Sequence, residues 1–180
     1  MASRSARRAG HRQCPPRARQ NNGELTFDVH YTEGSDIGYK RYEVNDLQPA
    51  FWFGHGLSYT TFDYSEFSAS QDNGTVRIRF TVTNSGPVTG TDVPQIYATL
   101  PDTSQERARR LVQWSRLSLA AGQSRTVELV VDDKHLSIWD TAAKQWSRPI
   151  GEYGLHLGAS AADLRLTTTL YLDRPQPAAR

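Results

Sequence analysis

The chain has 180 residues, of which 37% are hydrophobic and 22% are charged, a composition typical of one folded domain of ordinary size with extensions. No apolar run approaches the roughly 20 residues that cross a bilayer, which argues against a membrane-spanning protein. The single cysteine, Cys14, excludes an intramolecular disulfide and a cysteine-rich metal site.

The first 22 residues form a basic leader that we expect to be disordered. Residues 1–20 contain six arginines and no acid, whereas the net charge of the whole chain is only +2. The leader lacks both the apolar core of a signal peptide and the hydrophobicity that stabilises a fold. Three interpretations are open: a nucleic-acid-binding arm, an organelle transit peptide, or a non-native extension. We favour the third, because arginine alone attracts phosphate without specificity and no aromatic residues alternate with it for base stacking.

Residues 23–61 are irregular and rich in aromatic side chains. Alternation from Phe27 to Tyr31 predicts one short strand, after which Pro49 and several glycines interrupt any pattern. One short strand and loops cannot bury so many rings, so we expect them to contact a neighbouring domain. The rings are those of Phe27, Tyr31, Tyr39, Tyr42, Phe51, Trp52, Phe53 and Tyr59.

From Phe62 onward the sequence predicts short strands separated by turns. Residues 76–83 alternate strictly between apolar and polar, which indicates a strand with one wet face. The preceding Asp72-Asn73-Gly74 is a strong hairpin turn signal. Residues 84–87 end that strand, and we expect the next to begin after Gly90. In it, Val93, Gln95 and Tyr97 would share one face, and Ile96, Ala98 and Leu100 the other.

The remaining strands follow in the same manner. We expect Trp114 to be the large apolar anchor of residues 111–119, and Trp139 and Trp146 to flank a short hairpin. Tyr153 opens a late strand just after a glycine, as does a tyrosine corner, whose hydroxyl bonds back to the main chain. Seven or so strands without a long amphipathic helix predict an all-β, antiparallel β-sandwich.

A resemblance to a known family sharpens this prediction. Residues 53–62 read FGHGLSYTTF and closely resemble the signature of glycoside hydrolase family 3, the β-glucosidase and β-xylosidase family. Residues 32–40, 82–86, 93–97, 111–124 and 151–158 resemble further family motifs in the same order. The sequence departs from the family pattern at Trp52, Gln113 and Ala121, which puts only local turn geometry in doubt.

The resemblance implies a fold, a domain organisation and a parent activity. It implies a fibronectin type III or immunoglobulin-like sandwich over residues 62–172, with residues 23–61 as a linker and remnant of a preceding α/β-sandwich domain, and 173–180 as a flexible tail. Family members are retaining hydrolases of β-glucosides or β-xylosides, whose nucleophile and acid/base would precede residue 25. We therefore expect an accessory domain that is inactive alone, from a periplasmic or secreted parent. Its partners would be the missing catalytic domains, with no nucleic acid or membrane.

Several residues could carry chemistry, but we expect them to have structural roles and assign no catalytic, cofactor-binding or metal-binding residue. Glu33, Asp36 and Glu43 could form a carboxylate pair, but we expect them to be solvated or to cap turns. We expect His55 to fasten the linker by hydrogen bonds through both ring nitrogens. His30, His135 and His156 are scattered and have no metal-ligand spacing. Ser58 lacks the motif of a nucleophile, and the turn already explains the sequon at residues 73–75, which begins at Asn73.

The tryptophans leave one alternative function open. Trp114, Trp139 and Trp146 could form a sugar-stacking platform, although core packing is the default for tryptophan in a sandwich. The chain would then be a stand-alone module that binds carbohydrate or protein. An exposed apolar patch at residues 51–59 would indicate a missing partner domain, whereas rings lining a polar-rimmed groove would indicate a ligand site.

Overall fold

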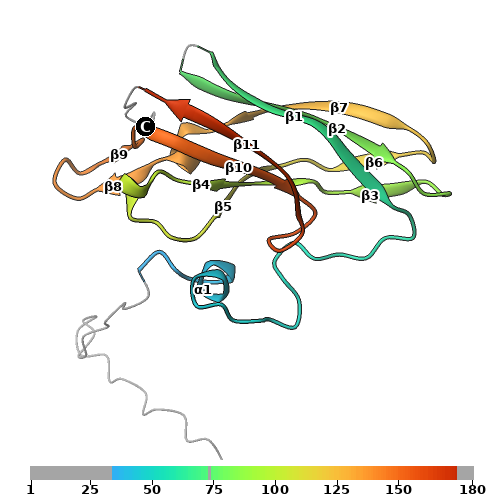
Figure 1. The fold of residues 1–180 in the computed structure, drawn as a ribbon, viewed down its shortest axis with the longest axis horizontal. Coiled ribbons are helices and arrows are strands. Elements are labelled where there is room, and N and C mark those ends of the chain that lie inside the picture. The colour runs from blue at the N-terminus through green and yellow to red at the C-terminus, as the bar shows by residue number, and fades with distance from the viewer. Residues whose placement is uncertain (1–33, 73, 174–180) are drawn as a thin grey trace, which may run out of the picture. The chain divides into compact units, whose positions relative to one another are not determined.

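The structure is a computed structural model that describes residues 34–72 and 74–173 (Figure 1). All of them fall within one compact unit. Several sequence predictions lie outside the described residues: the basic leader, the strand at residues 27–31, the turn residue Asn73, and all but the first residue of the tail.

Two antiparallel sheets form the body of the molecule, as Figure 1 shows. One sheet has three strands and the other has four, so the predicted antiparallel sandwich of about seven strands is confirmed. The first sheet is β1 (Phe62–Asp72), β2 (Thr75–Asn84) and β7 (Ser124–Val131), in the order β1-β2-β7. The second is β4 (Gln95–Thr99), β5 (Arg110–Trp114), β10 (Gly151–Gly158) and β11 (Leu164–Leu172), in the order β11-β10-β4-β5.

Shorter elements complete the fold. Two small antiparallel pairs are β3 (Gly90–Asp92) with β6 (Leu117–Leu119), and β8 (Ile138–Asp140) with β9 (Gln145–Ser147). The helices are α1 (Tyr39–Val44) and the 3-10 turns η1 (Asp102–Ser104) and η2 (Asp133–Leu136). The prediction of one continuous strand after Gly90 was wrong. It divides into β3 and β4 around Pro94, which has no N–H to give to a ladder.

The core lies between the two main sheets and follows the alternation of β2. Val76, Ile78, Phe80 and Val82 are fully buried, while the polar residues between them face outward. Burial of each such side chain contributes about 1.5–3 kcal/mol relative to leaving it exposed. The turn after β1 closes the predicted hairpin, with Asp72 paired to Thr75. This part of the fold needs no information beyond the local sequence.

Both faces of strand β4 are buried. Ile96 belongs to the core between the sheets, whereas Gln95 and Tyr97 point to the opposite side and are also buried. The ring of Tyr39, from α1, meets the ring of Tyr97 edge-on at 6.0 Å between centroids. The α1 segment therefore covers a sheet face that would otherwise be wet.

Tyr153 forms the predicted tyrosine corner at the start of β10. Its buried hydroxyl lies 2.8 Å from the carbonyl oxygen of Pro149 and 3.2 Å from that of Leu136. Burial raises the pKa of this hydroxyl, which keeps it protonated as a donor. The corner ties the four-stranded sheet to the η2 turn.

Candidate functional site

The segment that carries the family-like signature is fixed to the sandwich by its backbone. The carbonyl oxygen of Phe53 accepts a hydrogen bond from the N–H of Ala161 at 2.9 Å. The carbonyl oxygen of Gly54 accepts one from Nε2 of Gln95 at 3.2 Å. The same Gln95 donates to Ala159 and accepts from the hydroxyl of Tyr97, so its amide has a buried partner on each side. These contacts attach the backbone of the loop to β4 and to the segment before β11.

Gly54 is required at this point by two separate features of the backbone. Its φ is +81°, a conformation that favours glycine, and a Cβ here would lie 2.1 Å from Oε1 of Gln95. The close approach of Gly54 to Gln95 is what allows the loop to sit directly on β4.

Large apolar side chains nevertheless project from this fixed loop into solvent. We call residues 51–59 the exposed aromatic loop: Phe51 is 76% exposed, Phe53 is half exposed, and Leu57 and Tyr59 are almost completely exposed. Single exposed apolar residues are ordinary, but a run of them on an ordered loop marks an interaction surface.

A hollow of about 260 Å³ extends this surface beside Phe53. Its lining is almost wholly apolar and includes Val93, Leu111 and Trp114, with Gly54 and Gln95 at its base. Trp114 is 56% exposed, so the expectation that it anchors the core was wrong. Val112, Leu117 and Leu119 fill the core there instead, because β5 turns the side chain of Trp114 outward.

Ion pairs hold α1 against the loop that follows β4. The carboxylate of Asp36 accepts from Arg107 at 2.7 Å, and that of Glu43 accepts from Arg109 at 2.5 Å. Glu106, whose side chain is only 4% exposed, accepts from both Lys40 and Arg110. We call these contacts the α1 latch.

The α1 latch corrects the interpretation of the acids and adds residues that the sequence did not reveal. Asp36 and Glu43 are neither solvated nor turn caps, since each binds an arginine, and Glu33 lies outside the described residues. Burial, followed by the nearby charge of Arg110, lowers the pKa of Lys40. The only sequence signal was the cluster of arginines between Arg107 and Arg110, and nothing local indicated its partner.

His55 does not behave as predicted. Its ring stacks on Phe51 at 5.3 Å between centroids, and its backbone N–H donates to the carbonyl oxygen of Trp52. Among the described contacts its ring nitrogens make no hydrogen bond, so backbone groups of Phe53 and Gly54 fasten the loop instead.

The other candidate residues lie apart and have structural contacts. His135 lies 3.0 Å from the carbonyl oxygen of Val112, and Oγ of Ser58 accepts from the N–H of Thr60. His156 lies between two threonines of neighbouring strands, and His30 lies outside the described residues. Within residues 34–72 and 74–173, no three His, Cys, Asp or Glu side chains gather as a metal site. None of the described helices has the length and apolar character to cross a membrane.

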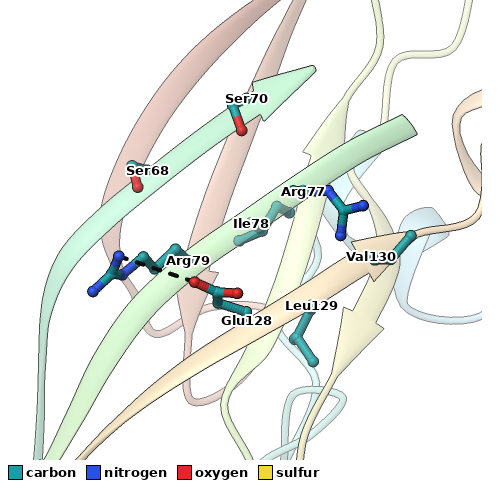
Figure 2. A pocket seen from close by; sticks show the side chains of 8 residues that line it. All are labelled: Ser68, Ser70, Arg77, Ile78, Arg79, Glu128, Leu129 and Val130. Carbon is teal, nitrogen blue, oxygen red and sulfur yellow. Dashed lines mark ion pairs between the residues drawn. The ribbon is translucent and has the colours of Figure 1, made fainter. Parts of the chain in front are cut away.

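The outer face of the three-stranded sheet carries a polar hollow of about 450 Å³ (Figure 2). Figure 2 shows Arg79 of β2 and Glu128 of β7 directed toward each other, at 4.0 Å between nitrogen and oxygen. Both side chains are well exposed, so solvent screens the pair and its contribution is small. Ser68 and Ser70 line the β1 side of the same hollow. This face behaves as an ordinary solvated sheet surface.

Comparison with known proteins points to one family of enzymes. A family model described as "Fibronectin type III-like domain" matches residues 92–161. The chain is 33% identical over 168 residues to the beta-glucosidase cel3A of Pyricularia oryzae, covering 79% of the chain and 23% of that protein. The chain spans between 18% and 23% of the length of the curated relatives it matches.

Solved structures give the same result. The beta-D-glucoside glucohydrolase of Trichoderma reesei superposes with a TM-score of 0.74 at 34% identity, covering 77% of this chain and 22% of that one. DesR, a beta-glucosidase of Streptomyces venezuelae, superposes with a TM-score of 0.74 at 37% identity, covering 78% of this chain and 18% of that one. In each case the similar part is a minor portion of a longer chain.

Proposed function

We propose that this chain, which carries the fibronectin type III-like domain of the glycoside hydrolase family 3 β-glucosidases, serves as an accessory domain that docks on the catalytic domains of such an enzyme. The parent would hydrolyse β-glucosides or β-xylosides, and the catalytic nucleophile and acid/base would come from domains outside these 180 residues. Its own part would be to brace them.

The observation that carries this proposal is the exposed aromatic loop. Phe51, Leu57 and Tyr59 are held in solvent by a loop whose backbone is fixed to β4 and to Ala161. The neighbouring hollow has an apolar lining, which suits a protein surface better than a hydroxyl-rich sugar. A partner domain that covered these side chains would remove their apolar area from water.

We also propose a division of the chain. Residues 62–172 would be the fibronectin type III-like domain, and residues 23–61 a linker with the remnant of a preceding domain. The start of β1 at Phe62 and the end of β11 at Leu172 support these limits. The ion pairs of the α1 latch indicate that residues 36–43 are attached to the sandwich rather than to the preceding domain.

The first test is direct. The purified 180-residue chain should release no nitrophenol from a nitrophenyl β-glucoside above a buffer blank. Release that follows the protein through purification and scales with its concentration would overturn the proposal.

A chimera tests the docking role. The fibronectin-like region of the T. reesei enzyme is replaced by residues 34–173 of this chain, alongside a truncation that ends before that region. The chimera should be soluble and active, whereas the truncation should not. The double substitution Phe51→Ser and Tyr59→Ser should reduce the chimera to the level of the truncation, and the matched change of Val130→Ser on the outer sheet face should leave it active. Equal activity of the chimera and the double variant would contradict the proposed docking surface.

A further inference from the structure

A third hollow, of about 580 Å³, lies beside the β8–β9 hairpin. Trp139 and Trp146 face each other across the hairpin, with ring centroids 5.7 Å apart and planes 73° apart. Trp139 is 50% exposed and Trp146 is partly buried, so the expectation of core packing was wrong for Trp139. The two rings form an aromatic corner, in which Trp139 is the more exposed ring.

Polar groups of the η1 turn also line this hollow, which we call the hairpin groove. Thr103, Ser104 and Gln105 line it. Gln105 has a φ of 58°, an uncommon conformation for a residue other than glycine, and its N–H donates to the carbonyl oxygen of Asp102 at 3.1 Å. This left-handed conformation caps the end of η1 and sets the position of Gln105 beside the turn.

The charged groups of the hairpin groove, Glu106 and Arg110, are already paired, and the cluster that they form with Lys40 carries one net positive charge. Glu106 accepts from Arg110 and from Lys40, and its side chain is 4% exposed. Arg110 donates in addition to the carbonyl oxygens of His135 and Ser137. A charged ligand would have to compete with these buried partners, whereas a neutral ligand would not.

From this combination we propose that the hairpin groove binds a neutral, β-linked gluco-oligosaccharide. A β-linked glucopyranose carries its ring hydroxyls in equatorial positions, so each ring face presents only C–H groups while the rim presents hydroxyls. The exposed part of the Trp139 ring matches the apolar ring face of the sugar. The hydroxyls of Thr103 and Ser104 and the amide of Gln105 match the sugar hydroxyls. Ligand pockets commonly combine aromatic walls with a small number of such polar groups.

The hairpin groove and the exposed aromatic loop differ in chemistry, and the two proposals stand independently. The loop presents bare apolar side chains, whereas the groove combines an aromatic wall with a hydroxyl and amide rim. A protein partner seated on Trp139 is the competing interpretation, and it predicts that oligosaccharide leaves the groove unaffected.

The test uses the full 180-residue chain, labelled with ¹⁵N and titrated with cellotetraose. The chain has four tryptophans, whose indole N–H signals report on separate places. Those of Trp139 and Trp146 should shift on titration, while those of Trp52 and Trp114 stay fixed. Tetragalacturonate, an acidic counterpart of similar size, should shift none of them. If no indole signal shifts at about 10 mM cellotetraose, any binding is too weak to matter and the proposal is overturned.

Variants locate the binding. Trp139→Ala should raise the dissociation constant about tenfold or more, because it removes a central aromatic contact. Gln105→Asn keeps a residue that tolerates the left-handed backbone but shortens the amide, and should weaken binding severalfold. Tyr171→Ala removes an exposed ring from β11 and should leave binding unchanged. If Trp139→Ala binds as the parent does, or if Tyr171→Ala weakens binding equally, the assignment to the groove is wrong. An unchanged dispersion of backbone signals confirms that each variant is folded.

Discussion

At the scale of single residues, the contact between Gly54 and Gln95 determines where the exposed aromatic loop lies. The amide of Gln95 is only 5% exposed and is held by Gly54, Ala159 and Tyr97 together. A side chain at residue 54 would have to displace an amide that cannot move without losing buried hydrogen bonds, each of which costs free energy when left unmade.

We therefore expect Gly54→Ala to lower the free energy of unfolding by about 2–4 kcal/mol, from backbone strain and lost hydrogen bonds together. Urea denaturation followed by tryptophan fluorescence measures this change. Gly56→Ala is the matched control, because no atom lies within 4 Å of a Cβ built there. Its stability should equal or slightly exceed that of the parent, and an equal loss in both variants would show that the Gln95 contact is unimportant.

At the scale of elements, His156 joins three strands of the larger sheet. Its Nε2 lies 3.0 Å from Oγ1 of Thr99 on β4, and its Nδ1 lies 3.1 Å from Oγ1 of Thr167 on β11. Burial, followed by the positive charge of Arg109, lowers the pKa of His156. The folded sheet thus holds this imidazole in its neutral form.

The sign of the resulting pH dependence follows from linkage. Below the ordinary histidine pKa, His156 binds a proton more readily in the unfolded chain than in the folded one. The free energy of unfolding therefore falls as the pH falls through the ordinary histidine pKa. Between about pH 7.5 and about pH 5, His156→Gln should lose less unfolding free energy than the parent chain does. Denaturation at each pH measures how the unfolding free energy of the parent chain and of the variant changes with pH. Equal changes in the two proteins would contradict the prediction.

The α1 latch is the second case at this scale. Glu106 sits between Lys40 and Arg110 and is nearly inaccessible to water. Glu106→Gln would leave two partly buried cations without their anion, and we expect it to cost about 2–4 kcal/mol of stability. It should also make α1 more susceptible to limited proteolysis.

Glu128→Gln is the control for this prediction. Its carboxylate meets Arg79 at 4.0 Å on the open face of the three-stranded sheet, where solvent screens the pair. Its unfolding midpoint should stay close to that of the parent, and a similar shift in both variants would mean that burial of Glu106 is not what matters.

At the scale of the whole molecule, the side chains that stabilise the fold and those proposed to bind a partner are separate sets. Phe80 is fully buried in the core, whereas Phe51 and Tyr59 lie in solvent. The double substitution Phe51→Ser and Tyr59→Ser should change unfolding free energy by less than about 1 kcal/mol, while Phe80→Ala should cost about 3–5 kcal/mol.

Binding of a hydrophobic dye gives the complementary measurement. The double variant should bind less dye than the parent chain, because it presents less apolar surface. A large loss of stability in the double variant would show that the exposed aromatic loop supports the fold itself.

The sequence by itself determined the features that depend on neighbours in the chain. Alternation in β2, the turn beginning at Asp72 and the corner at Tyr153 rest on side-chain periodicity and turn chemistry, which act over a few residues. The family resemblance at residues 53–62 likewise needed no coordinates. Together they predicted the sandwich, and the exposed loop was inferred from an excess of rings.

Only the tertiary structure decided which distant residues meet. The pairing of Asp36 with Arg107 and the contact of Tyr39 with Tyr97 join segments far apart in sequence, and the exposure of Trp114 and Trp139 depends on what packs around them. Burial and charge pairing depend on what lies across the space around a side chain, and a one-dimensional pattern records only what lies beside it along the chain.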